Sequence, residues 1–350
     1  MKNEKRVTIW EVAKLANVSA GTVSRFLNGI VLKPSTEKRV REAISQTGYQ
    51  KNITARTLRT GHSKSIGIIL PEWKSYYSMS VIEAFESVVF PKGYALIVSS
   101  YSDFSEQLSN MLLRNIDGVL CIPPSGIDDV ARAVIKECGE KGVPAVIINE
   151  YFERCEADFV MIDNAGSSMR AVEYGIHQGH TDIAIINGLQ TDYVSRERHH
   201  GYREALNLYD LGITDEYEKY GLYSAEGGYA AGIELLSLNK PPTAIFITNC
   251  AMAIGFFRAA RELKVSIPED VLVIAYDFDT RYEFISPNIP YVEQPLGEMG
   301  LQAAELLLRR IAGDNRKYPQ NIQLKTRLII NKNMSDTVSL SSINENHELF

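Results

Sequence analysis

The sequence lacks the features of several large protein classes. No apolar run approaches the roughly 18 residues of a membrane span, and the first ten residues, MKNEKRVTIW, contain no signal-peptide core. The four cysteines form no C-x-x-C pair, which favours reduced thiols in a cytoplasmic protein. His177 and His180 have no cysteine or carboxylate to complete a metal-ligand set, so neither a metal nor another cofactor is expected. Phosphate-loop, zinc-protease and serine-hydrolase motifs are missing too, which argues against an enzyme.

Charge is distributed unevenly along the 350 residues, which carry a net charge of −6. Residues 1–61 hold twelve Lys and Arg against four Glu, a charge of +8, and the remainder holds 25 against 39, a charge of −14. This asymmetry is typical of a protein in which only the N-terminal part meets a polyanion. A solvated basic arm is the alternative, but it would have low complexity, whereas this segment is strongly patterned.

Residues 8–48 show the apolar periodicity of three short amphipathic helices. The first begins behind Thr8 as an N-cap, the second begins behind Ser19, and the third ends at Gly48. Only the turn NVS separates the first two, which predicts a helix-turn-helix arrangement. A three-helix packing module without a ligand is the alternative, and the charge of +8 makes it the less favoured one. The side of the second helix opposite its apolar stripe carries small and hydrogen-bonding residues suited to phosphates and base edges: Gly21, Thr22, Ser24, Arg25 and Asn28.

From residue 64 onward, short apolar runs alternate with helical segments. The runs have the length and composition of buried parallel strands: SIGIILP, YALIVSS, GVLCIPP, PAVIINE, DIAIING, TAIFITN and VLVIAYD. The alternation predicts a doubly wound α/β architecture, and the number of strands predicts two similar lobes. Residues 160–168, VMIDNAGSS, are the candidate for the first crossing between the lobes.

Ligands of such sheets bind beyond the carboxyl ends of the strands. These ends carry neutral hydrogen-bonding groups, with one acid, one arginine and several aromatic residues nearby. Any one of these residues could instead cap a helix or close a turn, but their shared placement favours a cleft for a polyhydroxylated ligand such as a sugar or nucleoside. The candidates at this stage are Trp73, Tyr76, Ser125, Asn149, Arg196, Tyr223, Asn249 and Asp277.

The segments VTIWEVAKLANVSAGTVSRFLNG and RVREAISQTGYQKNITARTLRTGHSKSIGIILP resemble the bacterial lactose/galactose-repressor (LacI/GalR) family of transcription regulators. The likeness continues through VMIDN, RERHHGYREAL, IPEDVLVIAYDFD and QPLGEMGLQAAELLL to about residue 331. It implies a small all-α helix-turn-helix head followed by an α/β core of two doubly wound lobes, similar to periplasmic binding proteins and joined by three crossovers. It also implies a homodimer that binds a pseudo-palindromic operator in double-stranded DNA.

The resemblance also implies roles for particular residues. In the head, Ala20 and Gly21 match positions that read bases, and here they would do so by close packing. Residues 52–59 match a hinge helix that folds on DNA, in which Leu58 would wedge into the minor groove. The implied DNA-contacting set is Thr8, Ser19, Ala20, Gly21, Thr22, Ser24, Arg25, Asn28, Asn52, Ala55 and Leu58.

In the core, the same resemblance carries effector contacts onto Asn149, Arg196, Tyr223, Asn249, Asp277 and Gln294. Cys250 stands where the family usually has an aspartate, so this chain lacks one acid of the usual pocket.

We therefore expect a cytoplasmic, dimeric transcription regulator, most simply a repressor, controlled by a small molecule in the cleft between the lobes, a sugar or sugar derivative. Two alternatives stay open: a regulator controlled by a phosphorylated partner protein, and a sugar receptor without DNA function. The expected organisation is a head at 1–48, a hinge and linker at 49–63, a core at 64–333 and a polar tail at 334–350. Within the core, lobe 1 is expected at about 64–162 and 293–322, and lobe 2 at about 163–292 and 323–333.

Overall fold

The computed structural model describes most of the chain, in eight stretches: residues 7–27, 29–49, 61–73, 75–100, 104–124, 128–152, 155–277 and 289–330. The chain divides into two compact units, Met1–Ser63 and Lys64–Phe350. We call the first unit the head and the second unit the core, and each has its own buried apolar cluster.

The head contains the three predicted helices, α1 (Ile9–Leu15), α2 (Ala20–Leu27) and α3 (Pro34–Thr47). Both predicted N-caps are confirmed. Thr8 Oγ1 accepts from the Glu11 amide at 3.4 Å and Ser19 Oγ accepts from the Thr22 amide at 3.2 Å, which satisfies amides that have no partner within their helices. Gly48 ends α3 with φ of 62°, a left-handed conformation that glycine adopts without strain.

The head buries a small apolar core between its three helices. Because fully burying a branched side chain stabilises a fold by about 1.5–3 kcal/mol, this set can hold three short helices together without a ligand. Its buried members are Val12, Ala13, Ala16, Val23, Val40 and Ala43.

The described residues of the core form two six-stranded sheets. The first sheet has the order β11-β5-β4-β3-β1-β2 and its pairings are parallel throughout. Its strands are β1 (Ser65–Leu70), β2 (Ala95–Ser100), β3 (Gly118–Cys121), β4 (Ala145–Ile148), β5 (Asp158–Ile162) and β11 (Asn321–Leu324).

The second sheet has the order β12-β10-β9-β8-β6-β7 and is parallel except for the antiparallel pairing of β12 with β10. Its strands are β6 (Ile183–Asn187), β7 (Glu218–Tyr220), β8 (Ala244–Ile247), β9 (Leu272–Tyr276), β10 (Tyr291–Glu293) and β12 (Arg327–Ile329). We call the two sheets with their helices the first lobe and the second lobe.

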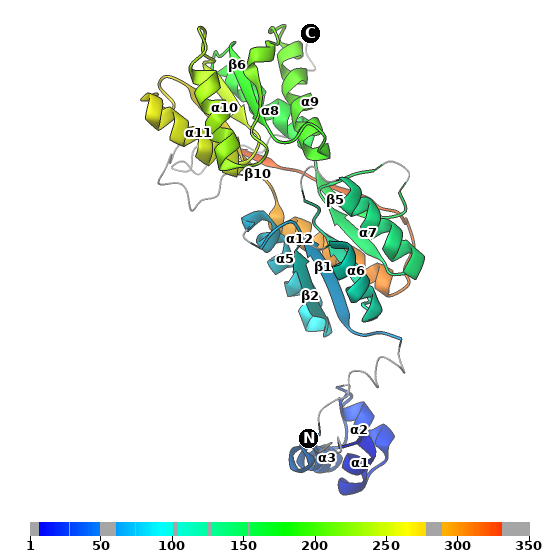
Figure 1. Cartoon of the computed structure of the whole chain (residues 1–350). Helices are drawn as coiled ribbons and strands as arrows, with labels where there is room; N and C mark the ends of the chain where they lie inside the picture. The colour runs from blue at the N-terminus through cyan, green and yellow to red at the C-terminus, as the bar shows by residue number, and fades with distance from the viewer. Residues whose placement is uncertain are drawn as a thin grey trace, which may run out of the picture. The chain divides into compact units, whose positions relative to one another are not determined.

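Helices cover both faces of each sheet (Figure 1). In the first lobe α5 packs on α12 and α6 packs near α7, while in the second lobe α8 pairs with α9 and α10 pairs with α11. The helices are α5 (Tyr76–Val89), α6 (Phe104–Leu113), α7 (Asp128–Lys141), α8 (Asn164–His177), α9 (Tyr193–Leu208), α10 (Ala225–Leu236), α11 (Cys250–Leu263) and α12 (Leu296–Ile311).

Within the described residues, the chain passes between the lobes three times. It passes from β5 to α8 at Asp163, from β10 to α12 at residues 294–295, and from β11 to β12 at residues 325–326. Strand β11 pairs with β5 as far as Leu324, close to the expected boundary at about 322.

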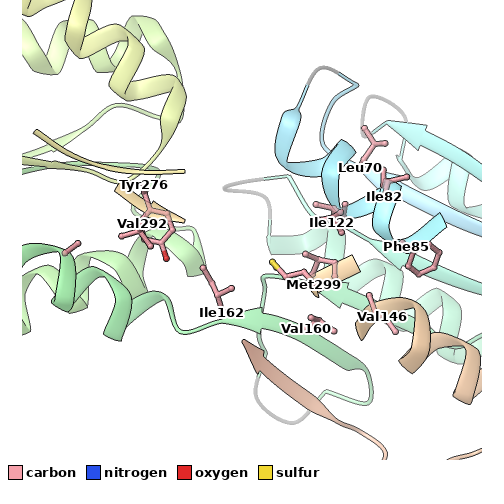
Figure 2. Close-up of a cluster of buried hydrophobic side chains, with 14 of the residues drawn as sticks. Leu70, Ile82, Phe85, Ile122, Val146, Val160, Ile162, Tyr276, Val292 and Met299 are labelled. Atoms are coloured by element: carbon pink, nitrogen blue, oxygen red, sulfur yellow. The ribbon is translucent and has the colours of Figure 1, made fainter. Parts of the chain in front are cut away.

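One buried cluster contains residues from both lobes (Figure 2). It includes Phe85 and Met299 from the packed pair α5 and α12, and Tyr276 and Val292 from the second sheet. The absence of a side chain at Gly300 permits the close approach of α12 to α5, because a Cβ there would lie 2.3 Å from the Val81 carbonyl oxygen.

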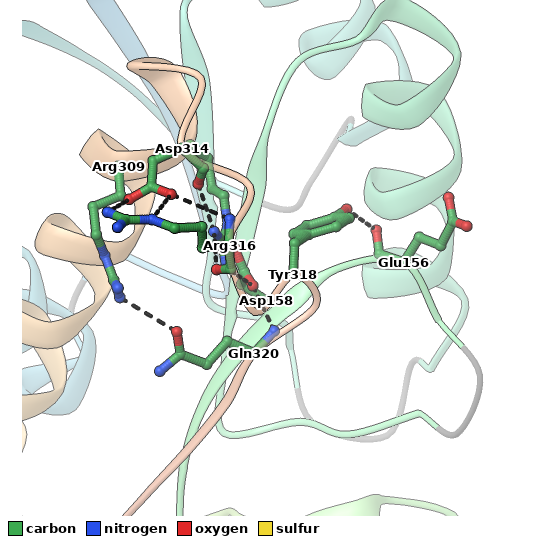
Figure 3. Close-up of polar contacts among 8 residues, drawn as sticks. Glu156, Asp158, Arg309, Asp314, Arg316, Tyr318 and Gln320 are labelled. Carbon is green, nitrogen blue, oxygen red and sulfur yellow. Dashed lines mark hydrogen bonds and ion pairs between the residues drawn. The ribbon is translucent and has the colours of Figure 1, made fainter.

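A buried ion pair fixes the end of α12 to the first sheet (Figure 3). Arg310 donates from Nε and Nη2 to the two carboxylate oxygens of Asp158, at 2.7 and 3.0 Å, and the two side chains are 2% and 0% exposed. The Gln320 amide also donates to Asp158 at 2.7 Å. These bonds compensate the desolvation of two buried charges and position the start of β11.

Candidate functional site

The exposed side of α2 carries adjacent hydrogen-bonding groups. The hydroxyls of Ser19 and Thr22 lie 3.0 Å apart, and Arg25 donates to Thr22 Oγ1 at 3.4 Å. Ala20 and Gly21 present no polar side chain beside them, and α2 contains no acidic residue. A polyanion can therefore approach this side of α2 closely and without repulsion from the helix itself.

The structure describes seven of the residues predicted to contact DNA. Thr8 forms a capping box with Glu11, in which its amide donates to Glu11 Oε2 at 2.6 Å, and its hydroxyl donates to the same oxygen at 3.0 Å. The remaining predicted residues lie outside the described residues: Asn28, Asn52, Ala55 and Leu58.

A cleft of about 1140 Å³ lies between the two lobes of the core. The first lobe contributes the residues that follow β1, β3 and β4 and one side of α5. The second lobe contributes residues from the starts of α9 and α11 and from the end of β9. This is the ligand position that parallel sheets define, at the carboxyl ends of their strands.

Arg198 on α9 lies in the cleft lining and is 3% exposed. It donates from Nε to Asn164 Oδ1 at 3.0 Å and from Nη1 to the Thr248 carbonyl at 2.6 Å. Its guanidinium carbon lies 3.5 Å from the centroid of the Tyr276 ring. Contacts on three elements therefore hold the guanidinium in one orientation before any ligand binds.

Asp277 follows β9 and accepts a hydrogen bond from the side-chain amide of Gln294. Burial raises the pKa of Asp277 to about 6, against the opposing effects of Arg198 and Gln294. Gln294 is 6% exposed, and its Oε1 has no hydrogen-bond partner among the described residues. The pair thus presents carboxylate and carbonyl oxygens that can accept bonds from a ligand donor.

Tyr223 forms part of the second-lobe wall and donates a hydrogen bond to Asp192. Asp192 is also the N-cap of α9, where it accepts from the Ser195 amide at 3.1 Å. Gly188 makes room for the tyrosine ring, since a Cβ there would lie 2.1 Å from its Cζ. Burial raises the pKa of Tyr223, so the hydroxyl stays protonated as a donor.

A hydrogen bond joins the two lobes through Asn149, a residue of the cleft lining. Asn164, the first residue of α8, donates from Nδ2 to Oδ1 of Asn149, the residue after β4, at 3.1 Å. Because Asn164 also accepts from Arg198, the ligand-facing arginine is connected to the first lobe through a single side chain.

The structure places six of the predicted effector-binding residues in the cleft lining and two outside it, and one lies outside the described residues. Trp73 is outside the lining and is 55% exposed, and Ser125 lies outside the described residues. Arg196 is exposed and outside the lining, with its guanidinium donating to the Thr191 carbonyl. The residues that do line the cleft are Tyr76, Asn149, Tyr223, Asn249, Asp277 and Gln294.

Of the two arginines on α9, Arg198 lines the cleft and Arg196 does not, because positions two apart on a helix differ by about 200° in direction. Three further residues line the cleft that the sequence pattern did not single out: Tyr77, Glu150 and Asp192. The start of α9 carried a usable signal, because Asp192 precedes Ser195 at the spacing of an N-cap and its amide partner.

Two kinds of site are absent from the part of the chain that the structure describes. No group of three or more His, Cys, Asp and Glu is placed to hold a metal ion there. None of its helices combines the length and the apolar composition needed to cross a membrane.

The fold and the cleft define a class of protein, a helix-turn-helix head attached to a two-lobed ligand-binding core. Residues 8–52 match the family of bacterial regulatory proteins named lacI, and residues 172–332 match a periplasmic binding protein-like domain. The HTH-type transcriptional repressor PurR of Pectobacterium carotovorum is 32% identical over 342 residues, which cover 94% of this chain and 97% of the relative. The chain belongs to the lacI family of bacterial regulatory proteins.

Further relatives agree with this assignment. The probable HTH-type transcriptional repressor ExuR of Bacillus subtilis is 33% identical over 315 residues, 89% of this chain and 93% of the relative. The regulator CelR in complex with cellobiose has a TM-score of 0.70 at 28% identity, covering 93% of this chain and 99% of that one. The Lac repressor dimer bound to operator and the anti-inducer ONPF has the same fold, with a TM-score of 0.80 at 24% identity over 93% of this chain and 98% of that one.

Proposed function

We propose that this chain is a dimeric transcriptional repressor that binds a palindromic DNA operator through its heads and is controlled by a small molecule in the cleft. The observation that carries the proposal is the combination, in one lacI-family chain, of a helix-turn-helix head and a lined cleft between two lobes. The site of action is then the cytoplasm, where the DNA is.

The head supplies the DNA-binding half of the function. In a helix-turn-helix unit the second helix enters the major groove, and here α2 presents Thr22, Ser24 and Arg25 for phosphates and base edges. Ala20 and Gly21 allow close packing on bases, including a thymine methyl. Leu58 keeps its predicted role as a minor-groove wedge in a hinge segment that folds on DNA.

The core supplies the control. A ligand that bonds to Asp277 and Arg198 in the second lobe, and to Asn149 in the first, stabilises one arrangement of the lobes. The other arrangement presents the two heads of a dimer differently to adjacent half-sites, so ligand and operator affinities become coupled. The amides, carboxylates and tyrosines of the lining suit a carbohydrate, and the cellobiose complex of CelR supports this class of effector.

Selection of duplexes from a random DNA pool by the purified full-length protein tests the DNA-binding half. We expect a palindromic site bound at least about 1,000-fold more tightly than a scrambled duplex at physiological salt. Recovery of unrelated sequences with equal affinities would overturn the proposal. If full operator affinity instead required a phosphorylated partner protein, control would not lie in the cleft.

Thermal stabilisation by sugars, sugar derivatives and nucleosides tests the control half. A ligand that binds only the native state adds RT ln(1 + [L]/Kd) to the free energy of unfolding, so the melting temperature rises with the logarithm of its excess over Kd. We expect at least one such ligand to change operator affinity. The curated relatives are named as transcription repressors, and we expect no turnover of any ligand that stabilises the protein.

A further inference from the structure

The cleft of this chain is strongly acidic. Among the described residues, seven carboxylates and two guanidinium groups line it. Three of the carboxylates belong to residues that are buried or half-buried, Glu150, Asp192 and Asp277. The other four belong to exposed residues: Glu72, Glu83, Glu293 and Glu298.

The two guanidinium groups of the lining, those of Arg198 and Arg327, only partly offset the repulsion of an incoming anion by the carboxylates. Both belong to the second lobe, and the first-lobe wall has no described cation in its lining. Arg198 faces Asp277, and two of its nitrogens already donate to Asn164 and Thr248. Arg327 is exposed on β12.

The sequence of the segments outside the described residues adds no net charge to the cleft. Those that adjoin the lining, at positions 74, 125–127, 153–154 and 278–288, together contain three Lys and Arg and three Asp and Glu. A cleft lined by one sign of charge focuses its field, and this raises the local concentration of ligands of opposite charge and lowers that of like charge.

The hydrogen-bonding groups of the cleft also favour a ligand without negative charge. The buried Oε1 of Gln294 has no partner among the described residues, and beside it Asp277 offers only acceptor oxygens at neutral pH. A hydroxyl or an N–H group of a ligand can satisfy both residues. The carboxylate of a uronate or the phosphate of a sugar phosphate cannot itself satisfy this pair, because it has no proton to donate. Even where the ligand's hydroxyls bond to the pair, its charge must lie elsewhere in a cleft lined by seven carboxylates.

We propose that the cleft selects against anions, so that the effector is a ligand without negative charge that presents hydroxyl or N–H donors to Asp277 and Gln294. Neutral sugars and amino sugars fit this description, whereas uronates and sugar phosphates are excluded. This inference rests on the proposed function of the cleft as the effector site.

Cys250 allows the charge of the cleft to be measured without knowledge of the effector. It lies in the lining, whereas Cys155 is similarly half-buried and outside it. Each thiol of the full-length protein is alkylated with neutral iodoacetamide and with anionic iodoacetate, and mass spectrometry gives the rate at each site. The ratio of the neutral to the anionic rate reports the local potential.

We expect this ratio to be at least about threefold higher at Cys250 than at Cys155, which corresponds to a potential of roughly one kT. Cys250 is the first residue of α11, and the positive end of the helix dipole there attracts anionic iodoacetate. The dipole would therefore lower the ratio at Cys250, so it cannot account for a higher one. Equal ratios, or a lower ratio at Cys250, would overturn the proposal.

Variants link the ratio to the carboxylates. Glu150→Gln combined with Glu293→Gln should lower the ratio at Cys250, whereas Glu305→Gln, on the exposed side of α12 and outside the lining, should not. If Cys250 reacts too slowly, Ala251→Cys in a Cys250→Ser background places the thiol at the next lining position. A ratio that responds equally to all three glutamate changes would contradict a cleft-specific field.

Matched ligands separate this inference from the function on which it rests. Hexoses and pentoses are compared with their uronate, 6- or 5-phosphate and amino counterparts by thermal stabilisation. Every stabilising ligand should lack negative charge, and an anion whose stabilisation disappears in Arg198→Lys would overturn the proposal. A panel without any stabilising ligand would count against small-molecule control, while the alkylation ratio would still decide the charge of the cleft.

Discussion

The guanidinium carbon of Arg198 lies 3.5 Å from the centroid of the Tyr276 ring, with Asp277 as the next residue along the chain. This stacking orders a charged fork at the point where the second lobe faces the cleft. Arg196, two residues earlier on α9, does not occupy this position, because its guanidinium is directed to the Thr191 carbonyl on the exposed side of the helix.

Arg198→Ala should abolish ligand-induced stabilisation, whereas Arg196→Ala should preserve it. The first change should also cost about 2–4 kcal/mol of folding free energy, because Asn164 and the Thr248 carbonyl lose a buried donor. Denaturant unfolding with and without a stabilising ligand measures both effects. A normal ligand response in Arg198→Ala would remove this residue from the site.

Asp277→Asn should stabilise the protein at neutral pH. Burial raises the pKa of Asp277 from 3.8 to about 6, so the folded state binds this proton more tightly than the unfolded state does. The wild type is therefore destabilised by ionisation of this group, by about 3 kcal/mol above pH 6, and the penalty disappears as the pH falls towards 4.

Unfolding of wild type and Asp277→Asn across this pH range checks the sign. The variant should be more stable at pH 7.5 and equally stable at pH 4. A stability difference that does not change with pH would contradict the assigned pKa of Asp277.

Asp158→Asn should destabilise the core strongly. It removes the charge that pairs with the buried guanidinium of Arg310, and breaking a buried pair from one side costs about 3–5 kcal/mol. Glu37→Gln, which breaks an exposed pair with Arg41, is the matched control and should have little effect. Similar losses from both changes in thermal unfolding would contradict the burial argument.

Arg25→Ala should weaken operator binding. If Arg25 contacts a phosphate, the negative slope of log affinity against log salt should become less steep by about one. Arg114→Ala removes the same charge from an exposed position in the core and serves as the control. Fluorescence anisotropy at several salt concentrations measures both. Unchanged affinity in Arg25→Ala would contradict the docking of α2 on DNA.

The sequence predicted the elements whose pattern is local. Thr8 and Ser19 are caps because their side chains bond within one turn. The seven long apolar runs became strands, and in all of them except the edge strand β2, burial on both faces leaves a continuous apolar signal. The short strands β7, β10 and β12 have only three residues each, so tertiary pairing and not sequence pattern defines them.

The residues that line the cleft were predicted less completely where they lie on a helix than where they follow a strand. Strand ends identify which residues approach a ligand, and Asn149, Asn249 and Asp277 were found in this way. On a helix, neighbouring residues face different directions, and the choice between Arg196 and Arg198 depends on how α9 packs against α8. That packing is a long-range property that spacing alone did not supply.

Coupling between the cleft and DNA tests the account most directly. Operator affinity is measured by fluorescence anisotropy for wild type, Arg198→Ala and Arg196→Ala, each with and without a ligand that stabilises the wild type. The account predicts a ligand-dependent change of about 5–150-fold in wild type and Arg196→Ala, and none in Arg198→Ala. An operator affinity that ignores the ligand in the wild type, or a response that survives in Arg198→Ala, would contradict it.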